Sequence, residues 1–165
     1  MSDIAVRPIR AEDVPQACAI LNRIIEIGGT TAFEQPVSED EFDAWYVNGA
    51  DLICCHVALD AAGAVAGFQW LGRNDSLPEG CGDIASFTRR EPVLRGAGRA
   101  LFACTVAVAR DRGLAEINAT IRADNALGLA YYGKMGFRDH VVTPAVPLRD
   151  GRPVDRISKR FDLRG

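Results

Sequence analysis

The sequence lacks the features that mark membrane, secreted and zinc-binding proteins. No stretch approaches the roughly eighteen consecutive apolar residues that a membrane-spanning helix needs. The opening residues, Met1-Ser2-Asp3-Ile4, carry charge where a signal peptide needs an apolar run. The 5 cysteines are an odd number without a CxxC pair, which favours neither a disulfide framework nor a zinc site. We therefore expect a cytoplasmic protein with no membrane contact and no bound metal.

Positive charge is not in excess either. The 19 Lys and Arg residues against 22 Asp and Glu residues give a net charge of −3, so no nucleic-acid partner is expected. With 48% hydrophobic residues, the 165 residues suffice for a single domain, residues 1–165, whose core needs no disulfide. The cysteines are expected to be buried, inert thiols. Adjacent Cys54 and Cys55 should point to opposite faces of a strand.

Hydrophobic periodicity and turn residues predict alternating helices and strands. Helices are predicted over residues 12–27, 38–48, 98–112 and 125–135. Strands are predicted over residues 4–9, 52–59, 64–71, 83–90, 115–121, 137–143 and 154–163. Ser38 and Glu41 have the spacing of a capping box at the start of the second helix. The strand–helix–strand order after residue 83 favours a parallel crossover, so we expect an α/β fold with a mixed sheet covered on both faces.

The most informative segment is the turn between the strand ending at Arg90 and the next helix. It reads Pro92-Val93-Leu94-Arg95-Gly96-Ala97-Gly98-Arg99-Ala100-Leu101. Two glycines allow a ligand close to the backbone, and the first N–H groups of a helix have no carbonyl partner. Arg95 and Arg99 add positive charge, so the turn is suited to a pyrophosphate. The alternative is a tight turn that serves only helix–sheet packing.

Two other phosphate-binding motifs do not match this turn. A Walker loop needs a Gly-Lys-Ser/Thr sequence, and the turn contains no lysine. A dinucleotide fingerprint needs a small residue where Leu101 stands.

A second segment, residues 125–137, makes the functional assignment more specific. Together with the turn, it resembles the GNAT family of acyl-CoA-dependent N-acetyltransferases. The family's pyrophosphate loop, Arg/Gln-x-x-Gly-x-Gly/Ala, is matched by Arg95, Gly98 and Ala100. Its later helix, Asn-x-x-Ala/Gly-x-x-x-Tyr-x-x-x-Gly-Phe, is matched by Asn125, Gly128, Tyr132, Gly136 and Phe137. The resemblance covers nearly the whole chain.

This resemblance implies a fold and a cofactor. The fold is a mixed, mostly antiparallel seven-stranded sheet with helices on both faces and a splay between the fourth and fifth strands. The cofactor is acetyl-CoA, whose pantetheine arm pairs with the fourth strand at Thr88 to Arg90 and contacts Asn125. Its pyrophosphate is held by the turn, here Arg95, Gly96, Ala97, Gly98, Arg99, Ala100 and Leu101. A homodimer is a further implication.

A narrower likeness concerns the acceptor. Residues 22–25, 30–34, 36–38 and 151–155 resemble the phosphinothricin (methionine sulfoximine) N-acetyltransferase branch, which acts on small amino-acid-like amines. This implies transfer to the primary amine of a small molecule, with Thr31, Phe33, Glu34, Trp70 and Arg73 beside the acceptor. The sequence departs from the branch at Ala85, where the branch has a glutamate. Acetylation of a protein N-terminus or lysine, or a non-catalytic acyl-CoA-binding module, are the alternatives.

The resemblance also assigns the catalytic acid. Tyr132 occupies the family's position for it, and a phenol of pKa ~10 can protonate a thiolate whose conjugate acid has pKa ~8.5. Tyr131 is expected to face away and to be structural. The base is left open between Asp83, Glu34 and water, because an amine of pKa ~8 needs only a modest base. His56 and His140 are expected to be non-catalytic.

Overall fold

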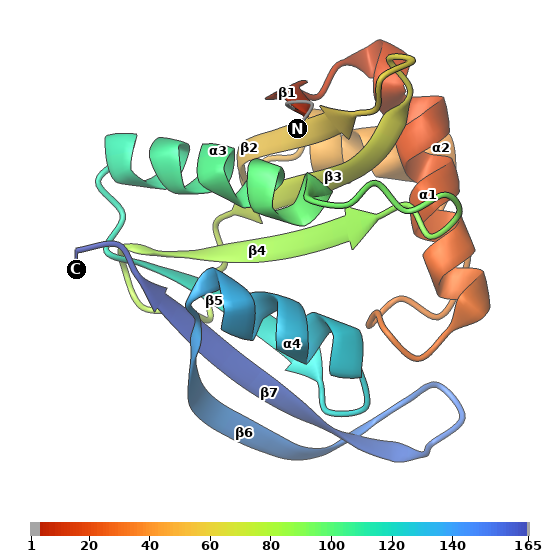
Figure 1. The fold of residues 1–165 in the computed structure, drawn as a ribbon. Helices are drawn as coiled ribbons and strands as arrows, with labels where there is room; N and C mark the ends of the chain where they lie inside the picture. Colours follow the sequence, from red (N-terminus) through yellow and green to blue (C-terminus); the bar gives the residue numbers. More distant parts are fainter. Residues whose placement is uncertain (1–3, 165) are drawn as a thin grey trace.

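The computed structural model describes residues 4–164, which form one seven-stranded sheet with helices on both faces (Figure 1). The strands are β1 (Ala5–Pro8), β2 (Leu52–Leu59), β3 (Val65–Gly72), β4 (Cys81–Thr88), β5 (Glu116–Arg122), β6 (Arg138–Pro147) and β7 (Pro153–Asp162). The α-helices are α1 (Val14–Ile27), α2 (Glu39–Phe42), α3 (Ala97–Asp111) and α4 (Ala126–Met135). A 3-10 turn at Ala11–Asp13 precedes α1, and a π-helical turn at Asp43–Val47 follows α2.

The strand order is β1-β2-β3-β4-β5-β7-β6. The β4–β5 pair is parallel, and the other neighbouring pairs described are antiparallel. Helix α1 packs on one face, against β3 and β4, while α3 packs on the other, against β2, β3 and β4 (Figure 1). Helix α4 lies on the α3 face, over β5. The expected mixed, mostly antiparallel sheet with helices on both faces is confirmed.

Most element boundaries differ from the prediction by one or two residues. The strand expected at 83–90 lies at 81–88, because Arg89 and Arg90 already turn toward the next helix. That helix begins at Ala97, one residue early, because Gly96 ends the turn with a φ of +87°. The capping box is confirmed, with Ser38 and Glu41 exchanging two hydrogen bonds of 3.1 Å. The helix expected through 48 is α2 followed by the π-helical turn.

Strands β4 and β5 separate soon after they meet. They pair at only three positions, from Cys81 opposite Glu116 to Asp83 opposite Asn118. Beyond these, β4 stays paired with β3, and β5 stays paired with β7. The two strands therefore diverge, as their separating arrows show (Figure 1). This is the expected splay, and it leaves the β5-facing edge of β4 without a neighbouring strand beyond Asp83.

A buried hydrophobic cluster lies on each face of the sheet. The α1 side holds Phe42 and Phe68, and the α3–α4 side holds Phe102 and Phe137. As predicted, Cys55 is buried in the first cluster, and Cys54 packs against the second. Burial raises the pKa of the Cys54 thiol to about 11, which keeps it protonated near neutral pH. Full burial was expected for all the cysteines, but Cys54 and Cys104 are half-buried.

Asp13 ties β1 to the start of α1. Its carboxylate accepts two hydrogen bonds from the Arg7 guanidinium, at 2.7 and 2.9 Å, and one from the Arg10 backbone N–H at 2.8 Å. The Arg7 hydrogen bonds, followed by the Arg10 N–H, hold the pKa of Asp13 below its ordinary value. We expect Asp13→Asn to lower the free energy of unfolding by about 2 kcal/mol near neutral pH, measured by urea denaturation.

The contribution of Asp13 should depend on pH in one direction. Because its pKa is lower in the folded state, the stabilisation is complete above the unfolded-state pKa of about 3.9 and disappears as pH falls through the folded-state pKa. The stability difference between wild type and Asp13→Asn should therefore shrink in acid. A difference that stays constant into strong acid would contradict this account.

Candidate functional site

The turn before α3 presents free backbone amides at a helix N-terminus. The Ala97 amide donates to the Leu94 carbonyl at 3.2 Å, and the Ala100 amide donates to the Gly96 carbonyl at 3.0 Å. Within the described residues, the amides of Gly98 and Arg99 have no such backbone partner outside the helix, and they fall too early to bond within it. Anion binding by every amide from 96 to 101 was expected. Ala97 and Ala100 are instead engaged in the turn and helix, whereas the amides of Gly96, Gly98 and Arg99 have no backbone acceptor within residues 4–164.

Three arginines lie close in sequence to these amides. Arg95 and Arg99 are exposed, Arg90 is half-buried, and none of the three takes part in an ion pair within residues 4–164. The helix dipole adds further positive potential at this end of α3. The turn therefore combines three free N–H donors with uncompensated positive charge, an arrangement that fits a diphosphate.

Gly98 is required by close packing against α4. A Cβ atom at this position would lie 2.6 Å from Cε1 of Tyr131, closer than real Cβ contacts come. The Gly98 carbonyl also accepts a hydrogen bond of 2.7 Å from the Tyr131 hydroxyl. The glycine thus allows the turn before α3 to lie directly against α4.

Tyr132 lies on α4 and contacts β4. Its hydroxyl is 2.8 Å from Ser86 Oγ, and its ring packs on Phe137 and Tyr131. Burial raises the pKa of Tyr132 well above its ordinary value, although the hydrogen bond to Ser86 opposes this. The phenol is therefore protonated near neutral pH, the state that a general acid needs.

Tyr131 does not face away from the sheet, contrary to expectation. Its hydroxyl accepts a hydrogen bond of 3.0 Å from Gln69 on β3 and donates to Gly98. Consecutive helix residues are only about 100° apart, so both tyrosines can reach a sheet whose strands diverge. Burial raises the pKa of Tyr131 to about 12.

Asp83 lies at the base of the splay, in the last β4–β5 pair. Its carboxylate oxygens accept hydrogen bonds from Asn118 at 3.1 Å and from Asn74 at 3.2 Å. Asp83 lies on β4, the strand that also carries Ser86, the hydrogen-bond partner of Tyr132. Two amide donors orient the carboxylate without neutralising its charge.

The loop at residues 28–37 is fastened to the β5–α4 connection. Asn125 caps α4 by accepting from the Gly128 N–H at 2.9 Å, and it donates to the Thr30 carbonyl at 2.8 Å. Arg122 donates to the carbonyl of Thr31, which is itself buried, at 3.2 Å. Both ends of the Asn125 amide are thus engaged in holding this loop, whereas the expected role was a contact to the cofactor arm.

The other residues predicted to lie beside the acceptor do not form one group in the structure. Phe33 stacks on Trp45, and Trp70 packs edge-on against Tyr46, so these rings join one aromatic group. The Trp70 indole Nε1–H is buried without a hydrogen-bond partner in the described structure.

Glu34 and Arg73 are both exposed and bound to backbone groups. Glu34 accepts from the Arg149 N–H at 2.9 Å, which ties its loop to the β6–β7 hairpin. Arg73 donates to the Ala50 carbonyl at 3.1 Å, at the end of β3 away from the Gly98 turn. Of the two, only Glu34 belongs to the loop that Arg122 and Asn125 fasten.

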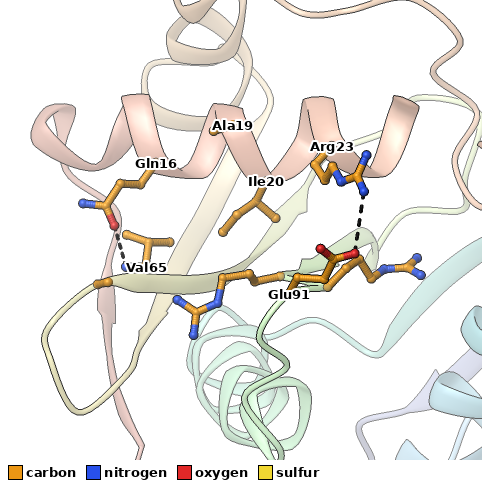
Figure 2. A pocket seen from close by; sticks show the side chains of 9 residues that line it. Gln16, Ala19, Ile20, Arg23, Val65 and Glu91 are labelled. Carbon is orange, nitrogen blue, oxygen red and sulfur yellow. Dashed lines mark hydrogen bonds and ion pairs between the residues drawn. The ribbon is translucent and has the colours of Figure 1, made fainter. Parts of the chain in front are cut away.

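A groove of about 430 Å³ lies beside this site, between α1 and the residues that follow β4 (Figure 2). Ile20 of α1 points into it, and Arg23 reaches across to Glu91 at 3.6 Å (Figure 2). The groove reaches the site through Arg89 and Arg90, but Tyr132, Asp83 and Gly98 do not line it. We therefore place the candidate active site at the splay and not in this groove.

Three polar residues at the site were not predicted from the sequence. Gln69, Ser86 and Thr105 are joined by hydrogen bonds beneath Tyr131 and Tyr132. Gln69 and Thr105 are fully buried. The available signal was a glutamine within an otherwise apolar strand and a threonine on the apolar stripe of a helix, both of which need a buried partner.

Two features are absent from the part of the chain that the structure describes. Between residues 4 and 164, no cluster of three His, Cys, Asp or Glu side chains is arranged to hold a metal ion. Over the same residues, no helix has the length and apolarity needed to cross a membrane.

The splayed sheet and the glycine-containing turn before α3 define the architecture of a GNAT acetyltransferase. Residues 21–137 match the family described as Acetyltransferase (GNAT) family. The chain therefore belongs to the GNAT family of acetyltransferases, and the resemblance seen in the two sequence motifs is confirmed. The expectation of an acetyltransferase that uses acetyl-CoA is confirmed at the level of the family.

Two curated relatives align with part of the chain. Mycothiol acetyltransferase of Clavibacter michiganensis subsp. michiganensis is 36% identical over 87 residues, which are 52% of this chain and 27% of that protein. Mycothiol acetyltransferase of Clavibacter sepedonicus is 33% identical over 100 residues, 61% of this chain and 31% of that protein. The chain thus corresponds to less than a third of the length of these relatives.

Solved structures match nearly the whole fold. A phosphinothricin acetyltransferase from Sinorhizobium meliloti in complex with acetyl-CoA has a TM-score of 0.85 and 23% identity, covering 98% of this chain and 89% of its own. An N-acetyltransferase from Staphylococcus aureus Mu50 has a TM-score of 0.86 and 20% identity, covering 98% of this chain and 99% of its own. At these identities the likeness establishes the fold.

Proposed function

We propose that the protein transfers an acetyl group from acetyl-CoA to the primary amine of a small molecule, an amino acid or analogue, by direct attack in a ternary complex. The observation that carries this proposal is the pair of free amides at Gly98 and Arg99. They lie among uncompensated arginines, after the strand whose edge β5 leaves open. This arrangement suits an extended ligand that ends in a diphosphate.

The cofactor's two ends would be held by different parts of this site. The amides of Gly98 and Arg99, with the side chains of Arg95 and Arg99, would hold the pyrophosphate. The open edge of β4 up to Thr88 would pair with the amide groups of the pantetheine arm, as an added strand does. Acetyl-CoA supplies the acetyl group as an activated thioester.

Tyr132 and Asp83 would manage the two proton movements of this reaction. The buried Tyr132 phenol holds its proton near neutral pH and can give it to the sulfur that leaves. The attacking amine must lose a proton, and Asp83 at the base of the splay can accept it directly or through water. Glu34 is the less favoured base, because one of its oxygens already accepts the Arg149 N–H.

A small acceptor is favoured by the way the loop at residues 28–37 is fastened. Arg122 and Asn125 hold its carbonyls, and Glu34 joins it to the β6–β7 hairpin, which favours a closed site over a peptide groove. Phe33 and Trp70 supply aromatic surface, and the unpaired Trp70 N–H offers a donor for a polar acceptor group. The names of the mycothiol and phosphinothricin acetyltransferases are consistent with such an acceptor.

The test combines calorimetry with coenzyme A and a thiol-release assay with acetyl-CoA. The acceptors are amino acids, amino-acid analogues, polyamines, amino sugars and short peptides. We expect saturable coenzyme A binding and thiol release with a small primary amine. Activity confined to peptides would favour a protein acetyltransferase, and binding without release for any amine would favour an acyl-CoA-binding module. No binding would reject the assignment of the turn.

A homodimer and a cytoplasmic location complete the proposal. The dimer is supported by the edge strand β6, where Val141 and Val142 are 51% and 55% exposed. Their apolar surface is available to a second copy of the chain.

A further inference from the structure

A chain of buried and part-buried hydrogen bonds runs from α3 through β3 and β4 to the two tyrosines of α4. The Thr105 hydroxyl donates to Gln69 Oε1 at 2.6 Å. Gln69 Nε2 donates to Ser86 Oγ at 2.8 Å and to the Tyr131 hydroxyl at 3.0 Å. Ser86 Oγ is in turn 2.8 Å from the Tyr132 hydroxyl. Thr105 therefore reaches the proposed catalytic acid through two intervening side chains.

Thr105 and Tyr131 contact opposite ends of the Gln69 amide. An amide nitrogen has two protons, and here both are used, by Ser86 and Tyr131. The amide oxygen must then be on the opposite side, where it accepts from Thr105. If the amide turned over, its oxygen would face Ser86 and Tyr131, and its N–H groups would face the threonine. The threonine hydroxyl, which also lies 3.2 Å from the Leu101 carbonyl, favours the observed orientation together with Tyr131, because the Tyr131 proton goes to the Gly98 carbonyl and its oxygen accepts from Gln69.

This orientation bears on where the Tyr132 proton lies. Ser86 has one hydroxyl proton, and its oxygen already accepts from Gln69. Ser86 Oγ and the Tyr132 oxygen are 2.8 Å apart, and either hydroxyl can be the donor. In one of these two arrangements Ser86 donates to Tyr132. The Tyr132 proton is then not committed to Ser86, and it stays available on the side of the splay.

We propose that Thr105, Gln69 and Ser86 are positioning residues that orient the Tyr132 hydroxyl to donate into the splay between β4 and β5. This inference rests on the proposed function. When the Tyr132 proton moves to the coenzyme A thiolate, the products are a neutral thiol and a tyrosinate. The Ser86 donor stabilises that tyrosinate, and the hydrogen bond between Ser86 and Tyr132 opposes the rise in the Tyr132 pKa that burial causes. The tyrosinate regains its proton from water, which receives the proton released by the amine.

The experiment measures the pKa of the thiol of bound coenzyme A, by following its thiolate absorbance in the ultraviolet as pH is raised. This readout needs no acceptor. A hydrogen-bond donor to the sulfur favours the thiolate and lowers its pKa. Thr105→Val keeps the side-chain shape and removes the hydroxyl, whereas Thr105→Ser keeps the hydroxyl. Ser86→Ala removes the donor to Tyr132, and Ser158→Ala on β7 is its matched control.

Thr105→Val and Ser86→Ala should each raise the pKa of the bound thiol by about one unit and lower kcat by about tenfold, without loss of coenzyme A affinity. Thr105→Ser should recover most of both properties. Ser158→Ala should leave both unchanged. Thermal midpoints of all variants would verify that each is folded under the assay conditions.

The outcomes separate this inference from the proposed function. If coenzyme A does not bind the wild type, the proposed function fails. If coenzyme A binds but Tyr132→Phe leaves the thiol pKa unchanged, the role of Tyr132 fails. If Tyr132→Phe raises the pKa while Thr105→Val and Ser86→Ala do not, the positioning inference alone is overturned. Equal effects of Thr105→Ser and Thr105→Val would also overturn it, because packing would then explain them.

Discussion

Replacing Tyr132 with phenylalanine is expected to lower kcat by about a hundredfold or more while coenzyme A binding is retained. Phenylalanine keeps the ring contacts with Phe137 and Tyr131 but has no proton to give to the leaving sulfur. The loss should therefore be seen in kcat, measured by thiol release with saturating substrates, and not in affinity, measured by calorimetry.

Tyr46→Phe is the matched control for this variant. Tyr46 is also a buried tyrosine, but it belongs to the hydrophobic cluster on the opposite face of the sheet. The same loss of a buried hydroxyl there should leave kcat close to that of the wild type. Comparable losses in Tyr46→Phe and Tyr132→Phe would mean that hydroxyl removal disturbs folding, and that Tyr132 has no specific role.

Replacing Gly98 with alanine is expected to abolish the rise in thermal midpoint that coenzyme A produces. The new Cβ atom would lie 2.6 Å from the Tyr131 ring, so the turn or α4 must shift. Either shift moves the free amides of Gly98 and Arg99 and disturbs the hydrogen bond from Tyr131 to the Gly98 carbonyl. The measurement is thermal unfolding with and without saturating coenzyme A.

Gly133→Ala provides the comparison for Gly98→Ala. Gly133 also lies within a helix, and a Cβ there would meet nothing within 4 Å. That variant should keep the full coenzyme A effect and gain about 1 kcal/mol of stability from the better helix former. If Gly98→Ala retains the coenzyme A effect as well, the turn is not the anion site.

Sequence reasoning located the elements that depend on local signals. Ser38 and Glu41 form a capping box, and Cys54 and Cys55 point to opposite faces of the sheet. Both features follow from rules that act over a few residues. The splay could be expected only through the family resemblance. No local sequence signal predicts that β4 and β5 pair at three positions and then separate. The separation depends on the other strand with which each of them pairs.

Other assignments at the site needed the tertiary structure. The direction of Tyr131 was predicted incorrectly, since its partners, Gln69 and Gly98, lie on other elements. Asn125 was expected at the cofactor arm, and the fold shows it capping α4 and holding the loop at Thr30. The roles of Gln69 and Thr105 could not be predicted from the local sequence, because the hydrogen bond between them joins positions 36 residues apart.

By itself, the sequence determined that Gly96, Gly98 and two arginines lie in a strand-to-helix turn, and it predicted an anion site there because helix N-termini have free N–H groups wherever they occur. It also determined the class of fold, through the periodicity of its helices and strands. Only the tertiary structure decided which amides remain free, how both tyrosines reach the splay and which buried groups orient Tyr132. Those facts depend on hydrogen bonds between elements distant in the chain, and local sequence carries little information about such contacts.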